Sequence, residues 1–352
     1  MTHLAMEVLP FRKVISMSCV SQTGDDLPLV DLLISLRERL LDIMSGSDRS
    51  QVLNLVTVPN VDLIDGDPAA EFRDILHEIL SSGLTEHGES VDYAALRASR
   101  AASCRPCAIP LARSQRGSPH YDDFRRCTGK LRTFDPSTLP DRNAQLAFWI
   151  NLYNTLVLDA VIALGVQRSI MEQRAGLTFL RRAAYVVGGQ RMSCDDIEHG
   201  ILRANRGHPL FPGKQFAPSD PRLRWVIKPF DARIHFALNC ASRSCPPIHA
   251  YTPEKLDSQL DLATRSYLAT EMQILPEKNT LHLSSIFQWF ATDFGRREGI
   301  IDFVLSHLSD TPERTWLMQQ RGRVSLRYKP FDWSLNSKVQ TESARSSMQK
   351  SQ

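Results

Sequence analysis

The sequence has almost no net charge and no long uninterrupted apolar run. Its 352 residues include 42 Lys and Arg against 39 Asp and Glu, which leaves a formal net charge of +3. So small an excess gives no argument for nucleic acid or an anionic membrane surface as a partner. No stretch approaches the roughly 18 uncharged apolar residues of a membrane span. Charged residues also interrupt the N-terminal segment where a secretory signal would place its apolar centre: Glu7, Arg12 and Lys13.

The chain also lacks a regular cysteine framework and a glycine-rich phosphate loop. Seven cysteines are an odd number, and their spacing follows no disulfide pattern. We therefore expect free thiols in a reducing compartment and a soluble cytoplasmic protein. Gly188 and Gly189 are typical of a hairpin turn rather than of a strand-to-helix phosphate loop. The sequence accordingly predicts no cofactor and no metal.

Composition and periodicity divide the chain into five parts. We expect a flexible N-terminus over 1–25, a helical part over 26–98 and a disordered insertion rich in Ser, Arg, Cys and Pro over 99–118. A core domain over 119–336 and a disordered polar tail over 337–352 follow. Helices and hairpins alternate without βαβ regularity. The predicted class is therefore α+β: a single large domain with a central apolar helix on a small antiparallel sheet, and N-terminal helices.

Three helices stand out in the pattern. Residues 26–46 and 67–83 are each expected to be amphipathic, whereas 143–165 is apolar on almost every face and predicts a central helix packed on several sides. Its polar exceptions, Asn151, Tyr153 and Asn154, must find partners if buried, so they either fasten neighbouring loops or line a cavity. The apolar stripe of the first helix is formed by Leu29, Leu32, Leu33, Leu36, Leu40 and Ile43.

The segment 224–240 reads as two strands divided by Pro229. Alternation along the second strand would put Phe236 and Cys240 on one face and His235 and Asn239 on the other. Cys240 would then be a small buried apolar residue, and His235 a buried histidine satisfied by a hydrogen bond.

Seven sequence blocks together resemble the family called domain of unknown function 547 (DUF547), over about residues 70–336. The resemblance implies a domain without an established reaction, which in eukaryotes often follows a DEP domain, a glutaredoxin-like domain or a coiled coil. We therefore expect an interaction or regulatory module in signalling or redox contexts, with an unknown protein partner. The insertion at 99–118 departs from the family pattern. The blocks are AFWINLYNTLVLDAVI (147–162), SCDDIEHGILR (193–203), DPRLRW (220–225), DARIHFALNCASRSCPPI (231–248), YTPEKLDSQLDLATRSYL (251–268), LSSIFQWFATDFG (283–295) and FDWSLN (331–336).

The stretch HFALNCASRSCPPIH (235–249) leaves several chemistries open. A thiol-dependent hydrolase or acyl transferase would use Cys245 as nucleophile, His235 as base, and Asn239 or Asn154 to orient the base. Zinc could be held by His235, Cys240, Cys245 and His249, although the first two would lie on opposite strand faces. A redox pair would join Cys240 and Cys245 across a turn, if the geometry permits.

Acidic residues and a histidine also gather at 195–199. Asp195, Asp196, Glu198 and His199 have the side chains of metal ligands, but the start of a capped, solvated helix is the favoured interpretation. The sequence alone therefore leaves open whether the protein is an enzyme.

Overall fold

The computed structural model describes residues 27–46, 48, 51–54, 69–70, 73–74, 77, 90–94, 96, 128–172 and 177–338. The predictions for the N-terminus (1–25) and the insertion (99–118) lie outside these residues. So do most of the predicted helix 67–83 and most of the tail.

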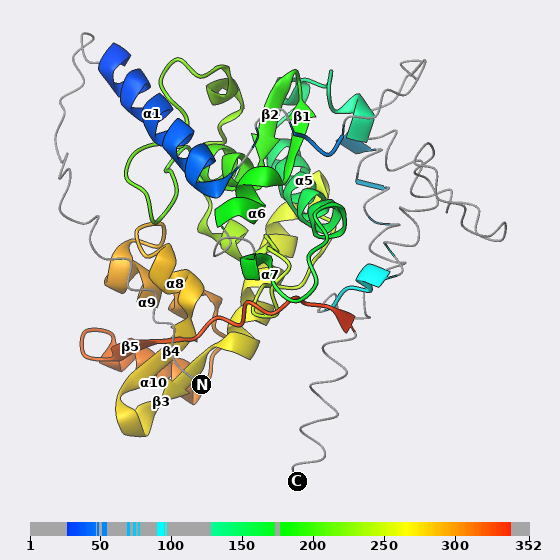
Figure 1. Ribbon diagram of the computed structural model, residues 1–352. Helices are drawn as coiled ribbons and strands as arrows, with labels where there is room; N and C mark the ends of the chain where they lie inside the picture. Colours follow the sequence, from blue (N-terminus) through cyan, green and yellow to red (C-terminus); the bar gives the residue numbers. More distant parts are fainter. Residues whose placement is uncertain are drawn as a thin grey trace, which may run out of the picture.

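The predicted central helix is α5, Arg142–Ala163, and its burial is confirmed (Figure 1). Asp141 caps it by accepting a hydrogen bond from the Ala144 amide at 2.8 Å. All residues from Leu146 to Val161 are buried, so the helix is surrounded by protein on every side. Among the described residues, α5 is also the one helix long and apolar enough to cross a membrane, but 89% of its most apolar window lies inside the fold. By length and composition α5 therefore approaches a membrane span, contrary to the prediction from the sequence, but its burial is that of a core helix.

A two-stranded hairpin lies against this helix. Strands β1 (Ala184–Val187) and β2 (Gln190–Ser193) pair antiparallel, with Gly188 and Gly189 in the left-handed region at the turn, as predicted. The Tyr185 hydroxyl donates to Asp159 Oδ2 of α5 at 3.0 Å, which fastens the hairpin to the helix. The short helix α6 (Leu177–Arg182) precedes the hairpin.

The C-terminal part carries a second, mixed sheet in the order β3-β4-β5. Strands β3 (Gln273–Leu275) and β4 (Thr280–Ser284) form an antiparallel hairpin, and β5 (Ser325–Lys329) pairs parallel to β4. A parallel pair needs a long crossover. Three helices supply it: α8 (Ser285–Trp289), α9 (Arg296–His307) and α10 (Pro312–Gln320), while α7 (Leu256–Glu271) precedes the sheet. Helices with two small sheets confirm the α+β class.

The two strands predicted in 224–240 are wrong. The chain forms 3₁₀ turns at Pro221–Trp225 and Ala232–Phe236 instead. Each begins at an Asp-x-Arg sequence whose aspartate accepts from the arginine amide, at 2.9 Å from Arg222 and 3.0 Å from Arg233. These local side-chain-to-backbone bonds offer the chain a turn in place of a strand ladder. The opposite strand faces expected for His235 and Cys240 therefore do not exist.

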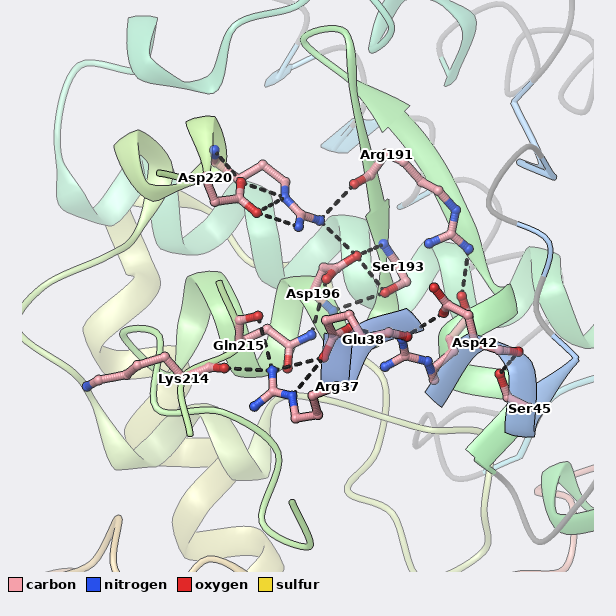
Figure 2. Close-up of polar contacts among 12 residues, drawn as sticks. Arg37, Glu38, Asp42, Ser45, Arg191, Ser193, Asp196, Lys214, Gln215 and Asp220 are labelled. Atoms are coloured by element: carbon pink, nitrogen blue, oxygen red, sulfur yellow. Dashed lines mark hydrogen bonds and ion pairs between the residues drawn. The ribbon is translucent and has the colours of Figure 1, made fainter. Parts of the chain in front are cut away.

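Helix α1 (Leu27–Ser45) is present, but it packs through its polar side. The predicted apolar stripe faces outward: Leu29 is 53%, Leu40 54% and Ile43 75% exposed. Figure 2 shows the opposite face, where Arg37 donates to the Lys214 carbonyl at 2.7 Å. Arg37 also donates to the Pro212 carbonyl at 2.7 Å. Ion pairs and a few apolar contacts therefore hold α1. Its other attachments are Glu38 and Asp42 to Arg181, and the buried side chains of Ile34 and Leu41.

Candidate functional site: a basic pocket above a buried ion network

The segment after β2 forms a capped helix, as predicted, but its turns are wide. The prediction that its start is solvated is wrong, because Asp195, Asp196 and His199 are buried. Residues Asp196–Leu202 adopt the π form, in which the amide of Arg203 donates to Glu198 O at 2.8 Å. Ser193 caps the helix start, since its hydroxyl accepts from the Asp196 amide and donates to the Asp196 carboxylate. Gly200 is required where it stands, because a Cβ there would lie 2.2 Å from the Phe216 ring. π turns are rare and often occur at functional sites, and this one directs Glu198, His199 and Arg203 into the protein.

A network of buried charges joins this helix to the loop after α8. The Arg203 guanidinium donates two hydrogen bonds to the Asp293 carboxylate, at 2.6 and 3.2 Å. His235 Nε2 donates to the same carboxylate at 3.0 Å. Arg203 also donates to His199 Nδ1 at 3.0 Å. The Phe290 ring contacts two members of this cluster: it stacks on His235 with ring centroids 4.2 Å apart, and the Arg203 guanidinium lies 4.6 Å from its centroid. We call Arg203, Asp293, His235 and His199 the buried ion network.

Opposing effects set the protonation of this network. Burial by itself would raise the pKa of Asp293, but the hydrogen bonds from His235 and Arg203 hold it well below its usual value. Burial lowers the pKa of His235, against the hydrogen bond and charge of Asp293. Burial likewise raises the pKa of Glu198 to about 6, although Arg203 and the Tyr153 hydroxyl, 3.1 Å away, oppose it. Near neutral pH, Asp293 is therefore ionised, and His235 is held neutral.

A pocket of about 760 Å³ lies directly against Asp293 and Arg203, and we call it the basic pocket. Two glycines shape its wall: a Cβ on Gly207 would lie 2.0 Å from Gly213 O, so the two backbones touch there. The aromatic side chain of Trp289 lies on another side, stacked on Trp333 with ring centroids 5.4 Å apart. The lining consists of Arg203, Arg206, Gly207, His208, Pro209, Gly213, Lys214, Gln288, Trp289, Ala291, Thr292, Asp293 and Arg296.

The basic pocket has four cationic side chains and one carboxylate. That carboxylate, Asp293, is already paired with Arg203 and with Arg206, whose guanidinium lies 3.1 Å away. Within the described part of the chain, the side-chain cations of Lys214 and Arg296 have no hydrogen-bond or ion-pair partner, and both residues are exposed. In Figure 2 the Lys214 side chain extends away from Arg37. The contact between these two residues is a hydrogen bond from Arg37 to the Lys214 backbone carbonyl, and it leaves the Lys214 ammonium free. The pocket therefore carries an excess of positive charge.

Three residues beside the basic pocket bring possible metal-binding atoms together. One such atom each of Asp195, His199 and His208 lies within 4.8 Å of the others. However, His199 Nδ1 accepts from Arg203, and His208 Nδ1 accepts from the Leu210 amide at 3.1 Å. Each neutral ring then carries its hydrogen on Nε2, so neither nitrogen has a free lone pair for a metal. A metal-binding histidine instead binds the metal through one nitrogen and donates a hydrogen bond from the other. The hydrogen bonds of the two histidines thus suit rings bound to protein rather than to a cation.

The residues proposed for thiol catalysis do not form a nucleophile–base pair. The His235 nitrogen that makes a hydrogen bond faces Asp293, while Cys245 Sγ lies 2.8 Å from Cys240 Sγ and 3.2 Å from the Cys240 amide. Burial also raises the pKa of the Cys245 thiol. Asn239 binds the backbone, with Nδ2 donating to Pro246 O at 2.6 Å and Oδ1 accepting from Ala241. The geometry therefore lends no support to a hydrolase built on these three residues.

Asn151 and Asn154 of α5 fasten loops, which was one of the two expected roles. Asn151 exchanges two hydrogen bonds with the backbone of Tyr251, at 2.8 and 2.9 Å. Asn154 donates to Ala237 O and accepts from the Asn239 amide, both at 2.9 Å. Neither side chain lines the basic pocket, nor does Tyr153, whose hydroxyl donates to Glu198 Oε2 at 3.1 Å. These amides hold the 235–251 segment against α5.

Sequence reasoning missed the residues of the basic pocket. Arg203 and Asp293 are 90 positions apart, and Lys214 and Arg296 sit in segments without periodicity. The one available signal was that HGILR and TDFG each fall within a block that resembles the family.

The fold and the site together define an α+β domain with a basic pocket above a buried ion network. Residues 136–268 match the model of the family described as "Protein of unknown function, DUF547", which confirms the resemblance over that range. The matched range contains α5, the π-helix and the 3₁₀ turns, so it includes Arg203, Lys214 and His235. No curated protein and no solved structure matches the chain.

Proposed function

We propose that the domain is a binding module that recognises an anionic group, such as a phosphate ester or a polycarboxylate, in the basic pocket. The observation that carries the proposal is the excess of cations in that pocket over a single, already neutralised carboxylate. A module of this kind would serve the regulatory role in signalling that the family resemblance suggests, with the anionic group carried by the partner.

Different side chains of the pocket would contact different parts of the ligand. Lys214 and Arg296 offer charge-assisted donors, and hydrogen bonds to charged groups contribute about 1.5–3 kcal/mol each. His208 adds a neutral N–H, because burial lowers its pKa to about 3. Trp289 provides an apolar wall for the organic part of a ligand. Asp293 does not repel the anion strongly, since Arg203 and Arg206 surround it.

Binding of inorganic pyrophosphate, measured by isothermal titration calorimetry, tests the proposal. The double variant Lys214→Gln, Arg296→Gln should bind at least about tenfold more weakly than wild type, because two charge-assisted bonds are lost. Arg327→Gln is the matched control, as it removes one exposed arginine on β5 that does not line the pocket. Added salt should weaken wild-type binding more than binding by the double variant.

Two results would refute the binding module. One is no binding of pyrophosphate or citrate by the folded wild-type protein. The other is an equal affinity in the double variant and in Arg327→Gln. Circular dichroism spectra of all variants establish that each is folded.

A further inference from the structure

We infer that Cys240 and Cys245 form a redox-active thiol pair, which closes into a reversible disulfide by exchange with a low-molecular-weight disulfide. This thiol pair is separate from the basic pocket and does not depend on the proposed function. The two sulfur atoms lie 2.8 Å apart, less than 1 Å beyond the roughly 2.05 Å of a disulfide bond. Both cysteines are half-buried, whereas Cys194 is fully buried.

The loop between the two cysteines is held in place from both ends. Asn239 bridges it by binding the backbone of Ala241 and of Pro246. The C-terminal segment pairs along its outer side, with Arg243 N donating to Ser334 O at 2.9 Å and Asn336 N donating to Ala241 O at 3.0 Å. Ala241 itself occupies the left-handed region, at φ +69°. Since the backbone already brings the sulfurs together, closing the disulfide requires little rearrangement.

The two thiols have different roles because their surroundings differ. A hydrogen bond from Cys245 lowers the pKa of Cys240, with further help from Ser242, whose Oγ lies 3.4 Å from Cys240 Sγ. Burial raises the pKa of Cys245, and so does the neighbouring Cys240 thiolate. The thiolate is the nucleophile in disulfide exchange. Cys240 is therefore the attacking residue, and Cys245 is the resolving one.

The exchange proceeds in two balanced steps. The Cys240 thiolate attacks one sulfur of the small disulfide, a mixed disulfide forms on Cys240, and one thiolate leaves. Cys240 is then uncharged and no longer disfavours ionisation of Cys245. Cys245 loses its proton and attacks Cys240 Sγ, which closes the protein disulfide and releases the second thiolate. The protein loses two electrons, the small disulfide gains them, and the protons of the two cysteines end on the two released thiols.

Peptide mapping of the full-length protein tests this inference, with oxidised glutathione as the probe. Trypsin cleaves after Arg233, Arg243 and Lys255, so the two cysteines fall in separate peptides, 234–243 and 244–255. After incubation with glutathione buffers and blocking of free thiols, the linked pair of peptides should rise from a trace in the reduced buffer to the dominant form in the oxidised one. Cys194, which is fully buried, should stay unmodified in peptide 192–203 as an internal control.

The variant Cys245→Ser separates the two roles. It cannot resolve the mixed disulfide, so glutathione should accumulate on peptide 234–243, and dithiothreitol should remove it. Wild-type protein that stays folded but gives no linked peptides in the oxidised buffer would overturn the inference. Glutathione that accumulates on Cys245 in the Cys240→Ser variant, with none on Cys240 in Cys245→Ser, would overturn the assignment of roles. Neither readout depends on anion binding, so the two proposals can fail separately.

Discussion

Replacement of Asp293 by asparagine tests the buried ion network most directly. The Asp293 side chain is 1% exposed and accepts hydrogen bonds from Arg203 and His235. Asp293→Asn keeps the size of the side chain but leaves the Arg203 guanidinium buried without its main counter-ion. Loss of one partner from a buried ion pair costs about 3–5 kcal/mol. We therefore expect the free energy of unfolding to fall by about that amount.

Urea unfolding followed by circular dichroism measures this loss, with the slope of the transition checked for two-state behaviour. Asp302→Asn is the matched control, because Asp302 pairs with Arg321 at the surface, where both side chains are half exposed. An exposed pair contributes less than about 1 kcal/mol. Equal losses in Asp293→Asn and Asp302→Asn would refute the reasoning that burial makes this ion pair important.

The same variant has a defined pH dependence. The hydrogen bonds from His235 and Arg203 overcome burial and hold the folded pKa of Asp293 below the unfolded value near 3.8. A carboxylate with a lowered pKa contributes stability that is fully present above the unfolded pKa and is lost as the pH falls through the folded pKa. The difference between wild type and Asp293→Asn should therefore be nearly constant from pH 5 to pH 7 and shrink below about pH 4. A difference that grows toward pH 3 would contradict the assigned sign.

Two further predictions concern α1 and the start of the π-helix. Leu41→Ala should reduce the hydrogen-exchange protection of residues 27–45 by about 2 kcal/mol, because Leu41 is buried. Leu40→Ala, at an exposed position, should change this protection by less than about 0.5 kcal/mol. Equal effects of the two substitutions would contradict the packing of α1. Burial raises the pKa of Asp195 to about 7, so its contribution to stability is present below the unfolded pKa near 3.8 and is lost as the pH rises through 7. Asp195→Asn cannot ionise, so its free energy of unfolding should rise by about 1–3 kcal/mol relative to that of wild type between pH 5 and pH 8. If urea unfolding gives the same difference between variant and wild type at both pH values, the carboxyl is not buried in solution.

The sequence by itself determined the elements that depend on composition along a short stretch. Helix α5 is apolar on nearly every face, and such a segment has no stable place except inside a protein. The turn at Gly188 and Gly189 followed from their freedom to adopt positive φ. The family resemblance rested on contiguous blocks, and the family match confirmed it over 136–268.

Only the tertiary structure decided which surfaces meet. Periodicity shows that α1 has an apolar stripe, but Arg181 and the carbonyls of 212–215 bind its polar side. The Asp-x-Arg turns overrode the strand pattern of 224–240, since a capping hydrogen bond forms locally and a strand needs a neighbour. The basic pocket depends on charges up to 90 positions apart, and no local pattern shows which cation each carboxylate neutralises and which remain free.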